Sequence, residues 1–182
     1  MKGWIQLAIL CGVDIVDIER FRETLDRSND HSHDRCCKSN HDRSHKSNQD
    51  SNHEINHEIN QDNNQDNNQD CNLDSEPIES PFRDRVFTKE EIIYCESKKV
   101  SRYESYAARF AAKEAVAKAF GTGIGQNMGW KDIEIKNDAA GKPHVILIGP
   151  AAAHSESINA KGISISLSHC RTYAVAYAVI EI

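Results

Sequence analysis

The sequence has no apolar run long enough to cross a bilayer. Its most apolar stretch, MKGWIQLAILCGVDIV, continues directly into charged residues and indicates a strand ending near Asp14, not a signal peptide. The six cysteines do not have the spacing of a disulfide framework, which favours a reducing compartment. The G-x-x-x-x-G-K-[ST] pattern of a P-loop and the G-x-S-x-G pattern of a nucleophile elbow are also missing. These absences argue against a membrane partner, a disulfide scaffold, a P-loop nucleotidase and an α/β-hydrolase.

Large apolar residues are almost lacking from residues 28–80. This segment holds 12 acidic and 4 basic side chains, whereas the other 129 residues hold 16 acidic and 18 basic ones. It repeats itself as HDRCCKSN, HDRSHKSN, HEINHEIN and QDNNQDNNQD, and it holds six of the nine histidines together with Cys36 and Cys37. Such a composition cannot bury enough apolar surface to offset its ordering entropy. We therefore expect a disordered low-complexity insertion within a single domain spanning 1–182, and no nucleic-acid partner.

The rest of the chain mixes helical and strand patterns. Ala, Glu and Lys predict a helix over 102–120 that ends at Gly121. Thr88 and Glu91 form a capping box before another helix. The alternation and turn signals predict further helices at 17–27 and 149–160, strands at 131–136 and over HVILI, and a final hairpin of ISISLSHC and TYAVAYAVIEI. This order predicts an α+β fold in which a small antiparallel sheet packs against helices.

Two acidic residues stand out in apolar surroundings. Asp14 lies in the first strand, where burying a carboxylate is costly unless it is paired or bound to a cation. Glu114 and Lys118 are four residues apart and project from one face of the long helix. Two simpler interpretations remain open, namely that Asp14 caps the next helix and that Glu114 and Lys118 form a surface ion pair.

Two further segments could contact an anion. Gly121 and Gly123, in GTGIG, permit close approach of a backbone, although one glycine at a helix end is routine capping. Ser168 and His169, in SLSHC, place a hydroxyl and an imidazole near a strand end, where they could contact a phosphate.

Taken together, these blocks resemble holo-acyl-carrier-protein synthase, the small bacterial-type 4′-phosphopantetheinyl transferase. The resemblance covers nearly all of the chain outside the insertion. It rests on G-V-D-I-V-D-I-E-R from Gly12, R-V-F-T-x-x-E from Arg85, R-F-A-A-K-E-A-x-A-K-A-x-G-T-G from Arg109, and the W-x-D-I-E, N-D-x-x-G-K-P and S-L-S-H segments.

The resemblance implies transfer of phosphopantetheine from coenzyme A to a serine of apo acyl carrier protein, with release of adenosine 3′,5′-bisphosphate. By analogy, Asp14 and Glu114 would hold Mg²⁺, Lys118 would neutralise phosphate charge, and Glu114 would be the general base through a metal-bound water. Members of the family are trimers with active sites between subunits. The resemblance also assigns the coenzyme A site to Arg109, Gly121, Gly123, Ser168 and His169.

In the family, a basic helix after the first metal carboxylate meets the acidic carrier protein. Here its contacts would be Arg20, Arg22 and Arg27. The sequence departs from the family in its acidic insertion, which starts at the end of that helix and would repel an acidic partner unless it swings away. Two other functions stay open: a non-catalytic coenzyme A or nucleotide binder, and a metal-binding interaction protein acting through the insertion. We expect a cytoplasmic location in a bacterium and a plastid location in a plastid-bearing protozoan.

Overall fold

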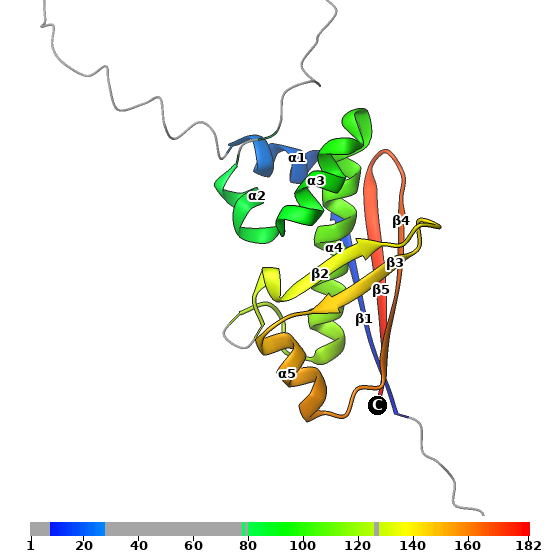
Figure 1. Cartoon of the computed structure of the whole chain (residues 1–182). Coiled ribbons are helices and arrows are strands. Elements are labelled where there is room, and N and C mark those ends of the chain that lie inside the picture. The colour runs from blue at the N-terminus through cyan, green and yellow to red at the C-terminus, as the bar shows by residue number, and fades with distance from the viewer. Residues whose placement is uncertain (1–7, 28–77, 79, 126–127) are drawn as a thin grey trace, which may run out of the picture.

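The computed structural model describes residues 8–27, 78, 80–125 and 128–182 (Figure 1). The start of the first predicted strand, within residues 1–7, and most of the predicted insertion at 28–80 therefore fall outside the described residues. The described elements are β1 (Ile9–Asp17), α1 (Ile18–Arg27), α2 (Pro81–Val86), α3 (Lys89–Ser97), η3 (Lys99–Ser101), α4 (Arg102–Phe120), η4 (Trp130–Asp132), β2 (Ile133–Asn137), β3 (Pro143–Leu147), α5 (Pro150–Ser157), β4 (Gly162–His169) and β5 (Tyr173–Glu181).

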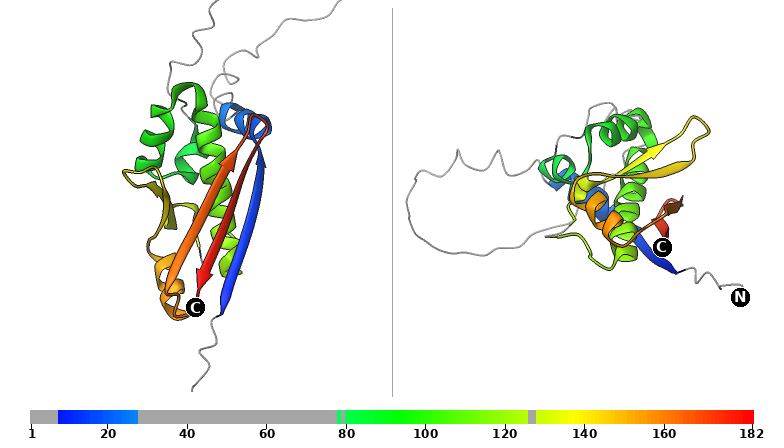
Figure 2. Two further views of the ribbon diagram at one scale, coloured as in Figure 1. Left: turned by 90° about the vertical axis from the view of Figure 1, so that its right-hand side faces the viewer. Right: turned by 60° about the horizontal axis from the view of Figure 1, so that its bottom comes forward.

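The main sheet has three antiparallel strands in the order β1-β5-β4, and β2 and β3 form a separate antiparallel pair. Helix α4 runs along one face of the main sheet, while the other face has no helix of the described chain over it (Figure 2). This arrangement confirms the α+β class and the C-terminal hairpin. The first strand does not end near Asp14 as predicted, because pairing with β5 continues to Asp17.

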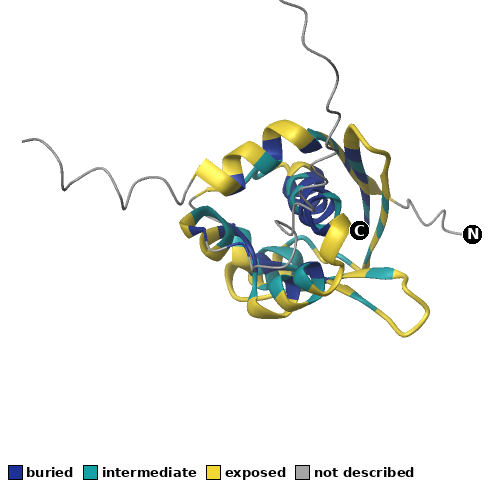
Figure 3. Ribbon diagram, turned by 90° about the horizontal axis from the view of Figure 1, so that it is seen from above, coloured by how far each residue is buried: buried dark blue, intermediate teal, exposed yellow. Residues whose placement is uncertain are grey.

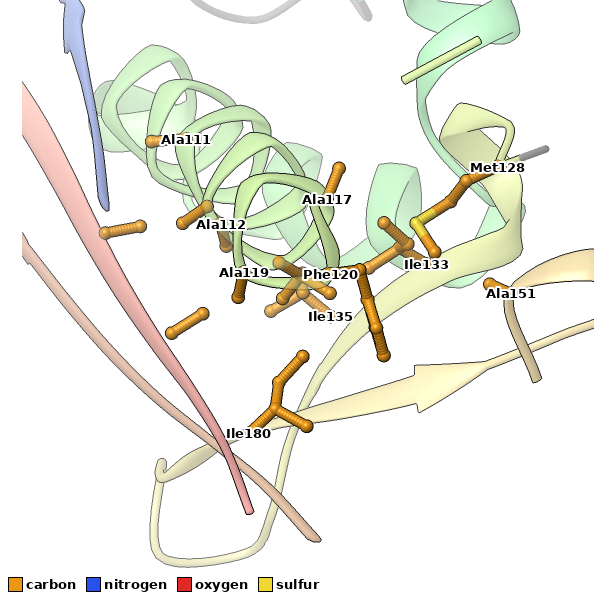
Figure 4. Close-up of a cluster of buried hydrophobic side chains, with 14 residues drawn as sticks. Ala111, Ala112, Ala117, Ala119, Phe120, Met128, Ile133, Ile135, Ala151 and Ile180 are labelled. Atoms are coloured by element: carbon orange, nitrogen blue, oxygen red, sulfur yellow. The ribbon is translucent and has the colours of Figure 1, made fainter. Parts of the chain in front are cut away.

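Small side chains bring α4 close to the sheet. Alanines of α4 and Ile180 of β5 belong to one buried cluster (Figure 4), which also includes Ala176 and Ala178 of β5. On β1, Gly12 has no side chain to hold the helix away. A Cβ placed there would lie 2.1 Å from the carbonyl oxygen of Ala115 and 2.6 Å from the amide nitrogen of Ala119. The glycine therefore fixes the spacing between β1 and α4, which carry the residues discussed below.

Helices α1, α2 and α3 surround one end of α4 and enclose a second apolar cluster. Seen from above, α4 is almost entirely buried at the centre while the outer faces of its neighbours are exposed (Figure 3). Phe21 and Leu25 of α1 enter this cluster, as the helical spacing predicts. The cluster therefore fixes α1 beside the C-terminal end of β1.

Most predicted boundaries agree with the structure. The long helix spans Arg102–Phe120 and ends at Gly121, whose φ of 74° lies in the left-handed region. The capping box of Thr88 and Glu91 is present. Helix α2 is an additional element, capped by Ser80, and both Ser80 and Ile78 are buried. The described fold thus resumes slightly before the end of the segment predicted as an insertion.

Candidate active site

The two acidic residues singled out in the sequence meet at one pocket. Asp14 of β1 and Glu114 of α4 both line a pocket of about 640 Å³, called pocket 1 below. Asp14 is on the sheet face that packs against α4, because its neighbour on β5 is the buried Ala176. Glu114 points to the same space, because Phe110, one turn earlier on the helix, also lines the pocket.

Lys118 completes this group of charges. Its Nζ donates a hydrogen bond to Asp14 Oδ1 at 2.6 Å and approaches the carbonyl oxygen of Val13 at 3.5 Å. The Asp14 side chain is only 15% exposed, whereas that of Lys118 is 49% exposed. Neither simpler interpretation matches this arrangement. Asp17, and not Asp14, accepts the capping hydrogen bond from the backbone of Arg20, and the carboxylate within bonding distance of Lys118 belongs to β1.

The environment raises the pKa of the Glu114 carboxyl above its ordinary value. Partial burial is the largest cause, repulsion from the Asp14 carboxylate comes second, and Lys118 opposes both. A raised pKa brings a carboxyl group closer to neutrality, where it exchanges protons more readily at physiological pH. A cation between the two carboxylates would remove the repulsion between them.

The donor set fits a hard divalent cation. Mg²⁺ is commonly held by one or two carboxylates, with waters and substrate phosphates filling its other positions. Asp14 and Glu114 supply two such carboxylates on an open pocket. Among the described residues no group of three or more His, Cys, Asp or Glu side chains could hold a metal. The described site therefore suits a metal that shares its coordination with a phosphate better than a closed structural metal site.

The floor of pocket 1 is aromatic. Phe21 and Phe110 lie 5.1 Å apart between ring centroids, Phe82 lies 6.0 Å from Phe21, and Trp130 stacks on Phe110 at 4.8 Å. No pattern in the sequence indicated that these rings belong to the site. Phe110 and Trp130 fall within the blocks that carry the resemblance, which assigns them no role. The pocket thus pairs a charged wall with an apolar floor.

Arg109 does not join this group. It is buried and lines a second pocket of about 310 Å³, called pocket 2, together with Tyr94, Lys136 and Asn137. Its guanidinium lies 3.8 Å from the ring centroid of Tyr94, and Nη2 donates to Asn137 Oδ1 at 2.6 Å. Its Nε is buried without a hydrogen-bond partner. Within the described residues no carboxylate pairs with Arg109, so its charge is available to an anion.

The two predicted glycines lie outside both pockets, and so do Ser168 and His169. Gly121 and Gly123 have positive φ values of 74° and 63° and close the C-terminus of α4, so capping is their visible role. Ser168 pairs with Val175, which pairs with Ile15, on the sheet face opposite to Asp14. His169 is exposed at the end of β4 and projects from the sheet face that packs against α4. In a single chain, therefore, Ser168 does not reach pocket 1.

The three arginines of α1 differ in their surroundings. Arg20 lines pocket 1. Arg22 lies 4.7 Å from the ring of Tyr103 and pairs with Asp26, and Arg27 pairs with Glu23. Of the three, Arg20 is the one placed beside the carboxylates.

The chain belongs to a family of transferases. Residues 68–178 match the model of the 4′-phosphopantetheinyl transferase superfamily, so the chain belongs to that superfamily. The holo-[acyl-carrier-protein] synthase of Ruminiclostridium cellulolyticum is 61% identical over 101 residues, which cover 56% of this chain and 75% of that relative. The corresponding enzyme of Protochlamydia amoebophila is 50% identical over 98 residues, covering 54% and 77%.

Solved structures agree with these relatives. The ACPS–CoA complex of Chronobacterium ammoniagenes matches with a TM-score of 0.59 and 25% identity, over 95% of this chain and 96% of that one. Together the comparisons confirm the resemblance and the expectation of an enzyme of the holo-[acyl-carrier-protein] synthase type. Among the described residues, none of the helices combines the length and apolar character that a bilayer crossing requires.

Proposed function

We propose that this enzyme transfers the 4′-phosphopantetheine group of coenzyme A to a serine of apo acyl carrier protein, and that the chemistry takes place in pocket 1. The observation that carries the proposal is that Asp14 and Glu114, about a hundred positions apart in sequence, line one pocket, with Lys118 paired to Asp14. This proposal favours an enzyme over a non-catalytic binder, because a binder would not need both carboxylates.

The residues of pocket 1 match the demands of phosphoryl transfer. The serine oxygen forms a bond to the β-phosphorus of coenzyme A, the bond from that phosphorus to the bridging oxygen breaks, and adenosine 3′,5′-bisphosphate leaves. Such a reaction depends mainly on positioning and charge neutralisation. Mg²⁺ held by Asp14 and Glu114 would supply a Lewis acid for the pyrophosphate. Lys118, which is hydrogen-bonded to Asp14, would neutralise phosphate charge, and Glu114 would be the general base for the serine hydroxyl.

The remaining surfaces fit the other parts of the substrates. The apolar floor at Phe21, Phe82 and Phe110 suits the uncharged pantetheine arm and excludes water from the reacting centre. We assign Arg109 and pocket 2 to an anionic part of coenzyme A remote from the pyrophosphate, because a buried guanidinium without a carboxylate partner favours an anion. The roles of Gly121, Gly123, Ser168 and His169 in coenzyme A binding stay predictions.

The carrier protein is proposed to dock over α1. Arg20 stands beside the carboxylates, so it meets an acidic partner whose serine enters pocket 1. Arg22 and Arg27 are further along the same helix, where each already has an acidic neighbour, and we expect them to contribute less. The cytoplasmic or plastid location also stays a prediction.

We further propose that three copies assemble through the open face of the main sheet. That face exposes a row of large apolar side chains, which a monomer would leave in water. The row consists of Ile9, Val13, Ile15, Tyr173 and Tyr177, each between 47% and 63% exposed. Assembly through this face would also bring Ser168, which projects from it, toward a neighbouring copy.

Val13→Asp should break the trimer. Val13 is 56% exposed and lies opposite Tyr177 in the row, so a buried carboxylate there would be costly in the assembly. Light scattering on the eluted protein should give three chain masses for the wild type and one for the variant. Val100→Asp is the matched control, since Val100 is 79% exposed on η3 away from this face. A Val13→Asp protein that keeps the wild-type mass would contradict the proposed interface.

The transfer reaction itself is tested by incubating the protein with coenzyme A, Mg²⁺ and apo acyl carrier protein. Mass spectrometry should show one phosphopantetheine group added to the carrier serine. A chain in which residues 29–76 are replaced by a short Gly/Ser linker should retain this activity, because the described site uses none of them. Loss of all activity in this shortened, folded chain would instead favour a function in the insertion. Binding of coenzyme A without any mass gain would favour the non-catalytic binder.

Magnesium should stabilise the protein through Asp14 and Glu114. A ligand that binds only the folded state raises the melting temperature, by about 2–4 °C per ~1 kcal/mol for a chain of this size. Thermal melts with and without MgCl₂ should show the rise in the wild type and not in Asp14→Asn. Asp84→Asn is a suitable control because Asp84 is exposed on α2 and outside pocket 1. An equal rise in Asp14→Asn would place the metal elsewhere.

A further inference from the structure

A fully buried ion pair lies behind the pocket. Lys113 Nζ and Glu91 Oε2 are 2.8 Å apart, and neither side chain is exposed. Lys113 also donates to the carbonyl oxygens of Trp130, at 2.9 Å, and Ile133. All three ammonium protons therefore have acceptors. Burial lowers the pKa of Lys113, and the neighbouring carboxylate opposes that shift.

Glu91 is equally well connected. Its Oε2 accepts from the backbone of Thr88 at 2.9 Å in the capping box, and its Oε1 accepts from the backbone of Ile135 at 3.0 Å. One carboxylate thus joins the start of α3, the middle of α4 and strand β2. Replacing a buried ion pair by apolar residues is often neutral for stability, so stability alone does not account for such a pair.

The pair is connected to both pockets. On its pocket 1 side, Lys113 holds the backbone of Trp130, and the Trp130 ring stacks on Phe110 of the pocket floor. On its pocket 2 side, Ile135 is itself a lining residue, and Arg109 lies one helical turn before Lys113. The pair therefore joins the three elements that line pocket 2, namely α3, α4 and β2, and one of them, α4, also lines pocket 1.

The pair is one of the buried contacts that hold α4 in its rotation. Successive residues on a helix point about 100° apart. Lys113 lies inward between α3 and β2, its neighbour Glu114 lines pocket 1, and Lys118 lies one turn beyond Glu114. A helix turned by even a small angle would move both side chains relative to Asp14 on the separate strand β1.

We infer that Glu91 and Lys113 form a positioning unit for the transfer reaction, which fixes the rotation of α4 and the Trp130 turn so that Glu114 and Lys118 face Asp14. Neither residue touches the substrates, so they act through their neighbours. Misplacement of reacting groups by about 1 Å can cost on the order of a hundredfold in rate. The pair should therefore matter more for turnover than for the binding of coenzyme A.

The decisive variant is Glu91→Asp, which keeps the buried charge but shortens its reach by one methylene group. At a temperature where circular dichroism shows a folded protein, kcat should fall at least about tenfold while KM for coenzyme A changes less than about threefold. Glu104→Asp makes the same change on a partly exposed site of α4 and should leave kcat unchanged. A Glu91→Asp enzyme with kcat within about twofold of the wild type overturns the inference.

The fluorescence of Trp130 gives a second readout, which reports directly on the η4 turn. The chain has two tryptophans, so a Trp4→Phe background reports Trp130 alone. Glu91→Asp should change its emission maximum and its quenching by acrylamide, whereas Glu104→Asp should not. Unchanged Trp130 emission in a folded Glu91→Asp protein contradicts the inference. If Glu91→Asp does not fold, the neutral pair Glu91→Gln/Lys113→Met takes its place, with the same expected loss of kcat and the same overturning result.

This inference rests on the transfer reaction proposed for pocket 1, and the two can fail separately. A wild-type protein that adds nothing to the carrier serine refutes the proposed reaction. An active wild type whose positioning variants are equally active refutes the positioning role alone.

Discussion

Glu114→Gln is expected to lower kcat/KM by about 10²- to 10⁴-fold, the range for loss of a general acid or base. The substitution removes a carboxylate that is proposed both to hold the metal and to accept the serine proton. Its effect on the fold should be small, because the Glu114 carboxylate repels Asp14 and has no buried ion pair of its own. Steady-state kinetics and thermal melts on the same samples measure the two effects.

The control for this variant is Glu104→Gln, on the same helix and also partly exposed. It should be active and as stable as the wild type. Comparable losses of stability and turnover in Glu114→Gln would instead indicate that Glu114 has a structural role, and the proposal for pocket 1 would fail.

The same variant should change how stability depends on pH. Without metal, the raised pKa means that folded Glu114 holds its proton more tightly than the unfolded chain does. Its contribution is therefore most favourable below the unfolded value of 4.5 and is lost as pH rises through the higher folded pKa. Denaturation curves across this range should show the loss in the wild type, and Glu114→Gln should lack it.

Gly12→Val should have the largest effect on stability. A Cβ at this position would overlap the backbone of α4 at Ala115 and Ala119, and backbone atoms cannot rotate away as a side chain can. Overpacking of a core typically costs about 1–3 kcal/mol, and a branched side chain against backbone should exceed that range. Urea denaturation of the wild type and of Gly12→Val measures the loss in the free energy of unfolding. Activity should be lost as well, because β1 and α4 carry Asp14 and Glu114.

Gly162→Val is the matched control. Gly162 lies in the same sheet, on β4, but a Cβ there would meet no atom within 4 Å. It should fold and retain activity. A Gly12→Val protein as stable as this control would mean that the close contact between β1 and α4 is not needed.

Local signals account for much of what the sequence predicted. The Ala-, Glu- and Lys-rich run and Gly121 define α4, and the capping box defines the start of α3, because these features depend on near neighbours in the chain. The predicted end of β1 was wrong by three residues, because pairing with β5 extends the strand past Asp14 to Asp17. Ser80 and Pro81 carry a local signal for α2, namely a capping serine followed by proline in the first turn.

The residues of the site also differ in whether the sequence could reveal them. Asp14, Glu114 and Lys118 could be selected because charged residues in apolar segments stand out, and the structure brings them together. The pairing of Lys113 with Glu91 could not be deduced, because it joins residues from two helices whose packing the sequence does not display. The separation of Arg109 into pocket 2 was missed for the same reason.

The alanine-lined contact between α4 and the sheet has a consequence for how this enzyme could diversify. One wall of pocket 1 is built on that contact, which leaves no slack for a bulkier side chain. Part of the apolar floor belongs to the separate helices α1 and α2, through Phe21 and Phe82. Adaptation to donors of a different size is therefore expected to arise by changing those two rings, while the half of the pocket that carries the charges stays constant.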